Sequence, residues 1–132
     1  MIVVLDTNVV VSGVFFHGPP AAIVEHWLAG RFDVYATPAI VEEYLRVIED
    51  LSTLKAPHFT YPWEEILLAR CHLIPDAPPR LALPRDPADE KFLECARRVG
   101  AQYLVSGDRD LQAVEGPLEF TIVSPRQFLQ QL

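Results

Sequence analysis

Short apolar runs alternate along this chain with longer stretches of helical spacing. Residues 2–5 are apolar at every position, which is typical of a strand buried on both faces. Similar runs predict strands at 32–36, 102–105 and 120–123, with a minor strand at 71–74. Because strands alternate with helices, the pattern favours a parallel sheet covered by helices on both sides.

Turn and capping residues mark the ends of most predicted helices. Thr37 and Ser124 are suited to N-caps because each precedes a proline, and Gly30 and Gly100 are suited to helix stops. The helices are predicted at about 19–29, 38–50, 63–70, 87–99, 111–114 and 125–132. Residues 51–61 show no clear period, and the proline-rich stretch 76–86 is predicted to be non-helical.

Two of the predicted strands end in acidic residues. Asp6 follows the first buried run, and Asp108 and Asp110 follow the strand at 102–105. Parallel sheets bind ligands at the carboxyl ends of their strands, so we expect Asp6 and Asp108 to meet there. Asn8 and Ser106 would add neutral ligands or orienting groups. Helix capping is an alternative role for Asn8 and for one of the two later aspartates.

The predicted helix at 38–50 places two neighbouring glutamates, Glu42 and Glu43, on different faces. On a helical projection Glu42 lies opposite the apolar arc and is predicted to be solvated. Glu43 lies at the border of the arc, beside Val47, and is therefore predicted to face the packed side. An ion pair with a nearby basic residue is the alternative to a functional role for Glu43.

The helix at 87–99 places one carboxylate within its apolar stripe. Asp89 falls there, whereas the charged residues of the opposite face are Glu90, Lys91, Glu94, Arg97 and Arg98. An inward-facing carboxylate is costly unless it is paired, hydrogen-bonded or bound to a metal. The alternative is structural, because Asp89 is also placed to complete a capping box with Asp86.

The composition limits the class of protein. The 132 residues predict a single domain, 1–132, and no apolar stretch is long enough to cross a bilayer. No signal peptide is recognisable at the start, so we expect a cytoplasmic protein. Neither Cys71 nor Cys95 has the spacing of a metal or redox motif, and both are interpreted as buried apolar residues. The four histidines show no ligand-like spacing.

The net charge counts against nucleic-acid binding unless a metal intervenes. Eleven basic against eighteen acidic residues give a formal charge of −7, whereas nucleic-acid-binding proteins usually carry a basic surface. Converging carboxylates would repel one another without a cation. Mg²⁺ and Mn²⁺ prefer such oxygen ligands, and they serve phosphodiester hydrolysis. The acids therefore favour a Mg²⁺ or Mn²⁺ site.

Together these stretches resemble the PIN-domain family of metal-dependent nucleases. The resemblance spans the chain through VVLDTNVVVSG, TPAIVEEYLRVI, RDPADEKFLECA and YLVSGDRDL, in the family's order and spacing. The positions that match the family's four acids are Asp6, Glu43, Asp89 and Asp108. Asp110 matches an additional acid and Asn8 the amide of the opening motif. Ser106 stands where the family usually has threonine, so a hydroxyl is kept.

The resemblance implies both a fold and an activity. The fold would be a three-layer α/β/α sandwich around a parallel sheet of about five strands. The activity would be cleavage of single-stranded RNA with Mg²⁺ or Mn²⁺, with Asp6, Asp89 and Asp108 as metal ligands and Glu43 acting directly or through water. Small members are commonly toxins of toxin–antitoxin modules, which form homodimers and are held inactive by an antitoxin. The candidates for phosphate contact, because they flank the acidic motifs, are Arg80, Arg85 and Arg109.

Three other classes of protein are alternatives to this family. A response-regulator receiver domain needs a lysine after a later strand, and neither Lys55 nor Lys91 follows one. A haloacid-dehalogenase-like phosphatase would need an aspartate where Asn8 stands. The third rival is a non-catalytic PIN-like module that binds RNA or protein, and this alternative stays open.

Overall fold

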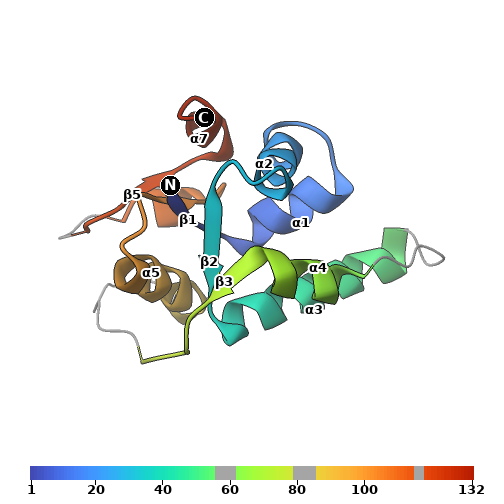
Figure 1. Cartoon of the computed structure of the whole chain (residues 1–132), viewed down its shortest axis with the longest axis horizontal. Coiled ribbons are helices and arrows are strands. Elements are labelled where there is room, and N and C mark those ends of the chain that lie inside the picture. Colours follow the sequence, from blue (N-terminus) through green and yellow to red (C-terminus); the bar gives the residue numbers. More distant parts are fainter. Residues whose placement is uncertain (56–61, 79–85, 115–117) are drawn as a thin grey trace.

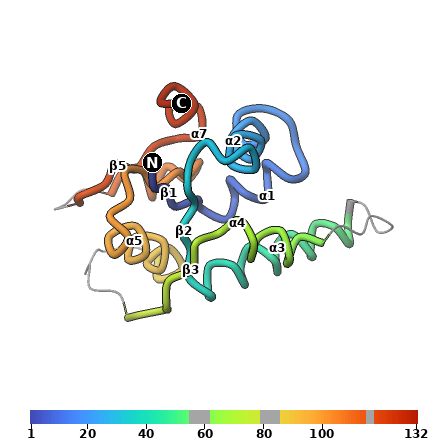
Figure 2. The backbone as a smooth tube through the Cα atoms, viewed as in Figure 1, coloured from blue at the N-terminus to red at the C-terminus, as the bar shows by residue number. Residues whose placement is uncertain are grey.

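The molecule is built around one parallel β-sheet. The structure is a computed structural model of the whole chain and describes residues 1–55, 62–78, 86–114 and 118–132. The sheet order is β3-β2-β1-β4-β5, with every neighbouring pair parallel. The strands are Ile2–Leu5 (β1), Asp33–Ala36 (β2), Cys71–Leu73 (β3), Tyr103–Val105 (β4) and Thr121–Val123 (β5). The N-terminal strand therefore lies in the middle of the fold (Figure 2).

Helices flank both faces of this sheet. They are Thr7–Phe15 (α1), Pro19–Leu28 (α2), Pro38–Lys55 (α3), Trp63–Arg70 (α4), Pro87–Val99 (α5), Arg109–Gln112 (α6) and Pro125–Leu129 (α7). In Figure 1, α2 and α7 lie above the sheet and α3 and α5 lie below it. Helix α5 contacts β1, β2 and β4, and α1 packs against α2 and α3. The three-layer α/β architecture expected from the sequence is confirmed.

Several of the predicted capping residues form the expected hydrogen bonds. The Thr37 hydroxyl accepts from the Ile40 N–H at 3.3 Å. Ser124 and Gln127 form a reciprocal capping box at the start of α7. Gly100 ends α5 in the left-handed conformation, with φ of 63°, which a residue without a side chain adopts at little cost.

Several helices differ from the sequence prediction, including the last, which ends at Leu129 and not at residue 132. Helix α1 was not predicted, because the apolar run over residues 9–11 shows no polar face; all three valines are buried. Helix α3 extends through residues 51–55, which were expected to be irregular, whereas the rest of that irregular stretch, 56–61, lies outside the described residues. Helix α6 begins at Arg109 and ends at Gln112, so it lies earlier than the predicted 111–114.

The core lies on both faces of β1. Val3, Val4 and Leu5 are fully buried, as the uninterrupted apolar run predicts. Cys71 and Cys95 are free thiols in the core, and burial raises the pKa of each to about 12. The interpretation of both as buried apolar residues is therefore confirmed.

Among the described residues, no single helix is both long and apolar enough to cross a membrane. Helices α1 and α2 together meet the length and composition criteria only across a bend of 93°.

Candidate functional site

Asp6 occupies the turn between β1 and α1, at the carboxyl edge of the sheet. Its side chain is only 7% exposed. The Ser106 hydroxyl, which follows β4, donates to Asp6 Oδ2 at 2.7 Å and thereby joins residues from two neighbouring strands. Asp6 is the N-cap residue of α1, yet its side chain makes no capping hydrogen bond. The carboxylate is therefore not occupied in closing the helix.

The electrostatic surroundings of Asp6 identify its acidic neighbours. Burial raises the pKa of Asp6 above its ordinary value, whereas hydrogen bonds from the Ser106 hydroxyl and the Thr7 backbone lower it. The negative charges of Asp89 and Glu43 raise this pKa further. Two of the other predicted acids, from α3 and α5, therefore act on Asp6 in the turn after β1.

Ser106 also connects Asp6 to the segment that carries Asp108. The hydroxyl that donates to Asp6 accepts from the Asp108 N–H at 3.0 Å. The Asp108 carboxylate caps α6 by accepting from the Asp110 N–H at 2.8 Å, so Asp108 is the capping residue of the pair. Asp110 is exposed in the first turn of α6. Asn8 is exposed in the first turn of α1 and is not its N-cap.

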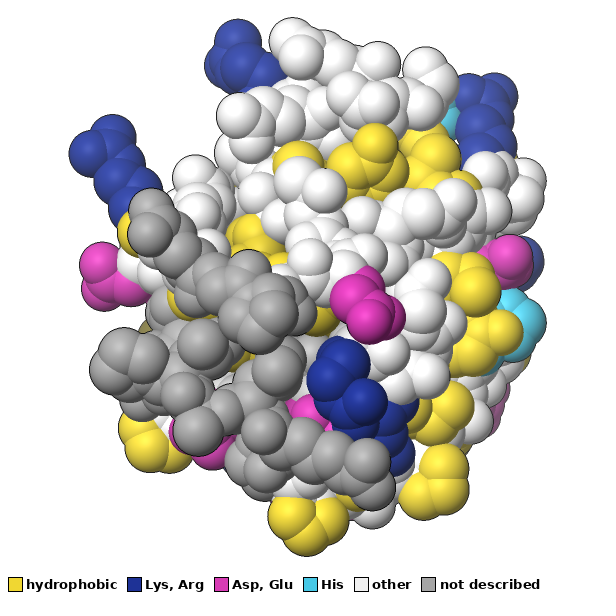
Figure 3. Space-filling view, turned by 90° about the vertical axis from the view of Figure 1, so that its left-hand side faces the viewer, with side chains coloured by type: hydrophobic (Ala, Val, Ile, Leu, Met, Phe, Trp, Pro, Cys, Tyr) yellow, Lys and Arg dark blue, Asp and Glu magenta, His cyan; other side chains and the backbone are white. Residues whose placement is uncertain are grey.

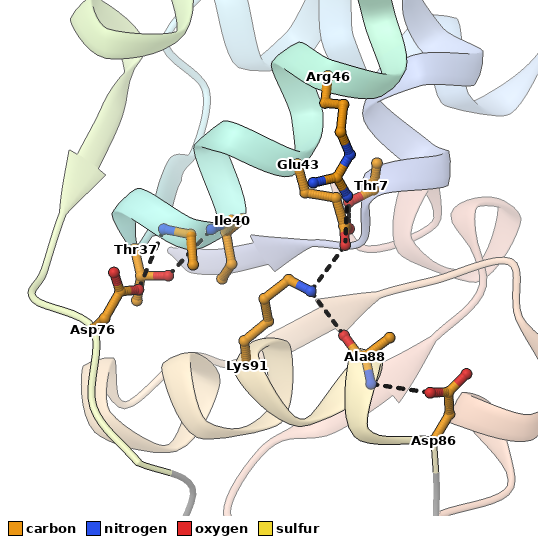
Figure 4. Close-up of polar contacts among 10 residues, drawn as sticks. Thr7, Thr37, Ile40, Glu43, Arg46, Asp76, Asp86, Ala88 and Lys91 are labelled. Carbon is orange, nitrogen blue, oxygen red and sulfur yellow. Dashed lines mark hydrogen bonds and ion pairs between the residues drawn. The ribbon is translucent and has the colours of Figure 1, made fainter. Parts of the chain in front are cut away.

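Glu43 is held from two directions at the border of the buried side of α3. The Thr7 hydroxyl donates to its Oε2. Lys91 Nζ, from α5, lies 2.8 Å from its Oε1, and Arg46 Nη2 lies 3.9 Å from the same oxygen. Figure 4 shows Thr7 and Lys91 converging on Glu43 from different elements. The basic partner that the sequence left as an alternative is therefore present, whereas Glu42 is exposed as predicted.

The fully buried Tyr44 fixes α3 against the end of β1. Its hydroxyl donates to the carbonyl of Leu5, the residue before Asp6. The Met1 carbonyl accepts a hydrogen bond from the Asp33 N–H of β2, and because carbonyls alternate along a strand, the Leu5 carbonyl also points toward β2. Strand β2 ends at Ala36, so the donor to the Leu5 carbonyl is the Tyr44 hydroxyl. The hydrogen bond thereby sets the position of Glu43, the neighbour of Tyr44, relative to Asp6.

Asp89 lies in the first turn of α5 and is partly buried. The N-cap of this helix is Asp86, whose carboxylate accepts from the Ala88 N–H at 3.0 Å. The positive end of the helix dipole favours a carboxylate at this position. Helix α5 packs against β1, and the negative charge of Asp89 raises the pKa of Asp6.

The donor chemistry of these residues fits a hard divalent cation. Every candidate ligand offers oxygen, and Asp6 is a buried carboxylate in the field of two others. Within the ranges that the structure describes, however, no three His, Cys, Asp or Glu side chains are arranged so that they could hold a metal ion together. The carboxylates therefore share an electrostatic field without forming a closed ligand sphere.

The proposed phosphate contacts are only partly described. Arg109 is exposed as the first residue of α6, beside Asp108. Arg80 and Arg85 lie outside the described residues. On the face shown in Figure 3, the basic side chains of the described residues stand in separate groups, and acidic side chains lie next to the central group. This arrangement agrees with the net acidic composition.

Glu94 corrects the sequence interpretation of α5. It was predicted on the charged outer face, but its side chain is only 2% exposed. Arg97 binds both of its oxygens, with Nη2 2.6 Å from Oε1 and Nε 3.1 Å from Oε2. Arg98 Nε lies 3.7 Å from Oε1, and its Nη1 donates to the Pro75 carbonyl at 2.6 Å. The buried charge is therefore compensated by two arginines of its own helix.

Sequence reasoning missed three residues that shape the site. Thr7 lies inside the Asp-Thr-Asn motif and Lys91 follows Asp89 by two positions, so proximity to a motif was the available signal. Tyr44 was assigned to the apolar face of its helix. Its hydroxyl partner depends on where the neighbouring strand ends, which no sequence period reveals.

The chain was compared with known proteins at three levels. The family profile described as PIN domain matches residues 2–110. A search of curated proteins gave no significant match. Among solved structures, VapBC2 from Rickettsia felis bound to a DNA fragment from its promoter contains a similar chain, with a TM-score of 0.62 and 17% identity. That alignment covers 94% of this chain and 98% of the other.

The structural likeness shows a shared fold, and the family profile covers all four acids, from Asp6 to Asp108. Together with a parallel sheet that brings acids to one edge, this match identifies the family. The chain belongs to the PIN domain family.

Proposed function

We propose that this PIN domain is a metal-dependent endoribonuclease that cleaves phosphodiester bonds in single-stranded RNA. The observation that carries the proposal is the state of Asp6. It is buried, its partners among the described residues are neutral donors, and two further carboxylates raise its pKa. Such a group gains stability when a cation binds beside it.

Asp6, Asp89 and Asp108 would hold Mg²⁺ or Mn²⁺, with Asp110 as an additional ligand near the surface. A cation at this position would supply charge stabilisation for a scissile phosphate and a bound water of lowered pKa. Ser106 orients Asp6, and its contact with the Asp108 backbone fixes the spacing between the two. Glu43 stands beside Asp6, where it would act directly or through water and help to deprotonate the attacking water.

Arg109 supports the assignment of a phosphodiester substrate. The side chain is exposed next to Asp108, so it can contact a phosphate without losing a buried partner. Arg80 and Arg85 are proposed to contribute in the same way. Because the protein as a whole is acidic, contacts to RNA would be confined to this edge and to the bound cation.

The test is cleavage of a labelled single-stranded RNA by the purified protein with Mg²⁺, with Mn²⁺ and with EDTA. We expect cleavage with either metal and none with EDTA. The variants Asp6→Asn and Asp89→Asn should lose activity, because each removes a charged oxygen ligand. The matched control is Glu42→Gln, which removes an exposed carboxylate next to Glu43 and should cleave like the wild type.

The outcomes separate the main proposal from its alternative. Mn²⁺ binding without any cleavage would favour a non-catalytic PIN-like module that binds RNA or protein. Metal-dependent cleavage that persists in both aspartate variants would place the active site elsewhere. If Mn²⁺ binding is absent or unchanged in both variants, the proposed metal site is wrong.

The biological setting proposed is that of a toxin in a toxin–antitoxin module. The similarity of fold to a chain of VapBC2, over nearly the full length of both, supports it. The toxin would be a cytoplasmic homodimer inhibited by an antitoxin. Light scattering should give twice the chain's mass, and a small partner encoded next to this gene should suppress cleavage when added at equal concentration. A monomer, or a neighbour without effect, would contradict this setting.

A further inference from the structure

Lys91 forms an ion pair with Glu43, one of the acids near the carboxyl edge of the sheet. Lys91 Nζ lies 2.8 Å from Glu43 Oε1 and donates to the Ala88 carbonyl at 2.9 Å. The two side chains are 27% and 18% exposed, so water screens this pair only in part. Figure 4 shows that Lys91 reaches from α5 across to Glu43 on α3.

The second oxygen of Glu43 is also engaged. The Thr7 hydroxyl donates to Oε2 while Lys91 holds Oε1, so the carboxylate is fixed at both ends by α1 and α5. A carboxylate held in this way already has a cation and a donor. It therefore gains less from a metal ion than one without a charged partner does.

Asp6 presents the opposite case within the same cluster. In the parts of the chain that the structure describes, the donors to its carboxylate are the neutral Ser106 hydroxyl and the Thr7 backbone N–H. Among the described residues, Lys91 thus places a positive charge against Glu43, whereas the donors to the Asp6 carboxylate are uncharged.

We propose that Lys91 is a positioning residue that occupies the place of a second cation, holds Glu43 out of direct metal coordination and limits the site to one divalent ion. This inference rests on the proposed function, because it concerns the same cluster of acids. It assigns Glu43 to indirect action, through water, and leaves Asp6, Asp89 and Asp108 as the direct ligands.

The test counts the Mn²⁺ ions bound by the full chain without RNA, by calorimetric titration and by electron paramagnetic resonance of free Mn²⁺. The wild type should bind one ion. Lys91→Met removes the charge and releases Glu43, so it should bind two. Lys91→Arg retains the charge and should bind one.

Arg46→Met is the matched control. Arg46 faces the same Glu43 oxygen, but at 3.9 Å and with 61% of its side chain exposed, so its removal should leave the count at one. A wild-type count other than one, or no additional ion in Lys91→Met, would overturn the inference. Two ions bound by Arg46→Met would also overturn it, because the loss of any positive charge near Glu43 would then have the same effect as the loss of Lys91.

A second measurement covers the case in which Lys91→Met is poorly folded. In EDTA, Lys91→Met and Glu43→Gln should each lower the Tm, and the double variant should fall no further than the lower of the two, because both changes break one pair. Additive losses would show that the two side chains do not act together and would contradict the inference.

This experiment separates the inference from the proposed function. If the wild type binds one Mn²⁺ and Lys91→Met binds two, but neither cleaves RNA, the proposed nuclease activity is contradicted and the role of Lys91 is supported. If the wild type binds two ions and cleaves RNA with metal, the nuclease activity is supported and the role of Lys91 is contradicted.

Discussion

Asp6 and Glu94 are both buried carboxylates, but the groups that bind them differ in charge. Glu94 receives a two-bond contact from Arg97 and a second arginine nearby, all from its own helix. Asp6 receives hydrogen bonds from neutral groups and lies in the field of Asp89 and Glu43. The charge of Glu94 is balanced by two arginines. Asp6, in contrast, lies near two further carboxylates, although burial already disfavours its ionised form.

This is the difference expected between a structural acid, Glu94, and the metal ligand that we propose for Asp6. A buried charge is tolerated when it is paired, as Glu94 is, and removing the partner is then costly. Burial raises the pKa of Asp6, so its ionised form disfavours folding until a cation binds, as the proposed site requires. Burial alone does not separate the two acids, whereas the charge of their partners does.

The largest expected effect is the loss of cleavage in Asp6→Asn, by at least about a hundredfold, because a ligand to the proposed cation is lost. The variant should remain folded, since Asn retains an acceptor for the Ser106 hydroxyl. Initial rates with Mn²⁺, measured beside circular dichroism spectra, check both points. Full activity in a folded variant would show that Asp6 is not a metal ligand and would leave no functional difference between Asp6 and Glu94.

Glu94→Gln should show the reverse pattern, with a Tm lower by roughly 5 °C or more and an unchanged rate per folded molecule. The neutral amide leaves Arg97 and Arg98 without their anion on the buried side of α5. Differential scanning calorimetry gives the Tm. The control Glu25→Gln, at an exposed position of α2, should leave the Tm almost unchanged. Equal losses in both variants would show that Glu94 is not a special site.

Ser106→Ala should reduce cleavage by about tenfold, because groups that orient a metal ligand typically contribute between ten- and a hundredfold. The substitution removes the hydroxyl that joins Asp6 to the Asp108 backbone. The expected loss is smaller than in Asp6→Asn because every acid remains. Steady-state rates across a Mn²⁺ series test this, and the activity should recover in part at high Mn²⁺. A loss that no concentration restores would argue against an orienting role.

The smallest effect concerns pH. The pKa of Asp6 is raised above its ordinary value of 3.8, so the protonated form favours folding. That stability is fully present below pH 3.8 and is lost as the pH rises through the higher folded-state pKa. In EDTA, Asp6→Asn should therefore gain Tm relative to the wild type as the pH rises toward neutrality. A difference that does not change with pH would show that Asp6 is not under electrostatic stress.

The sequence was sufficient for the architecture because its strong signals are local. The uninterrupted apolar run of β1, the caps at Thr37 and Ser124 and the stop at Gly100 each act within a few residues, and each appears in the structure. Alternating strands and helices then determine a parallel sheet, whose carboxyl edge collects Asp6 and Ser106.

What the sequence could not reveal depends on neighbours that are distant in the chain. A helical projection places Glu94 among charged residues, but it does not show that Arg97 and Arg98 fold over it. The same projection treats Lys91 as a surface charge, whereas its partner lies on another helix. The extent of α3 beyond residue 50 also escaped prediction, because its last turns lack a clear apolar period.

The central position of β1 has a consequence for the order in which the proposed site is assembled during synthesis. Asp6 leaves the ribosome well before Ser106, which lies 100 residues later and follows a strand, β4, that must insert beside β1. A nascent chain that ends before β4 contains Asp6 and Glu43 and lacks both Ser106 and Asp108. If the site cuts RNA, the growing chain is harmless to its own message until almost the whole domain has been translated.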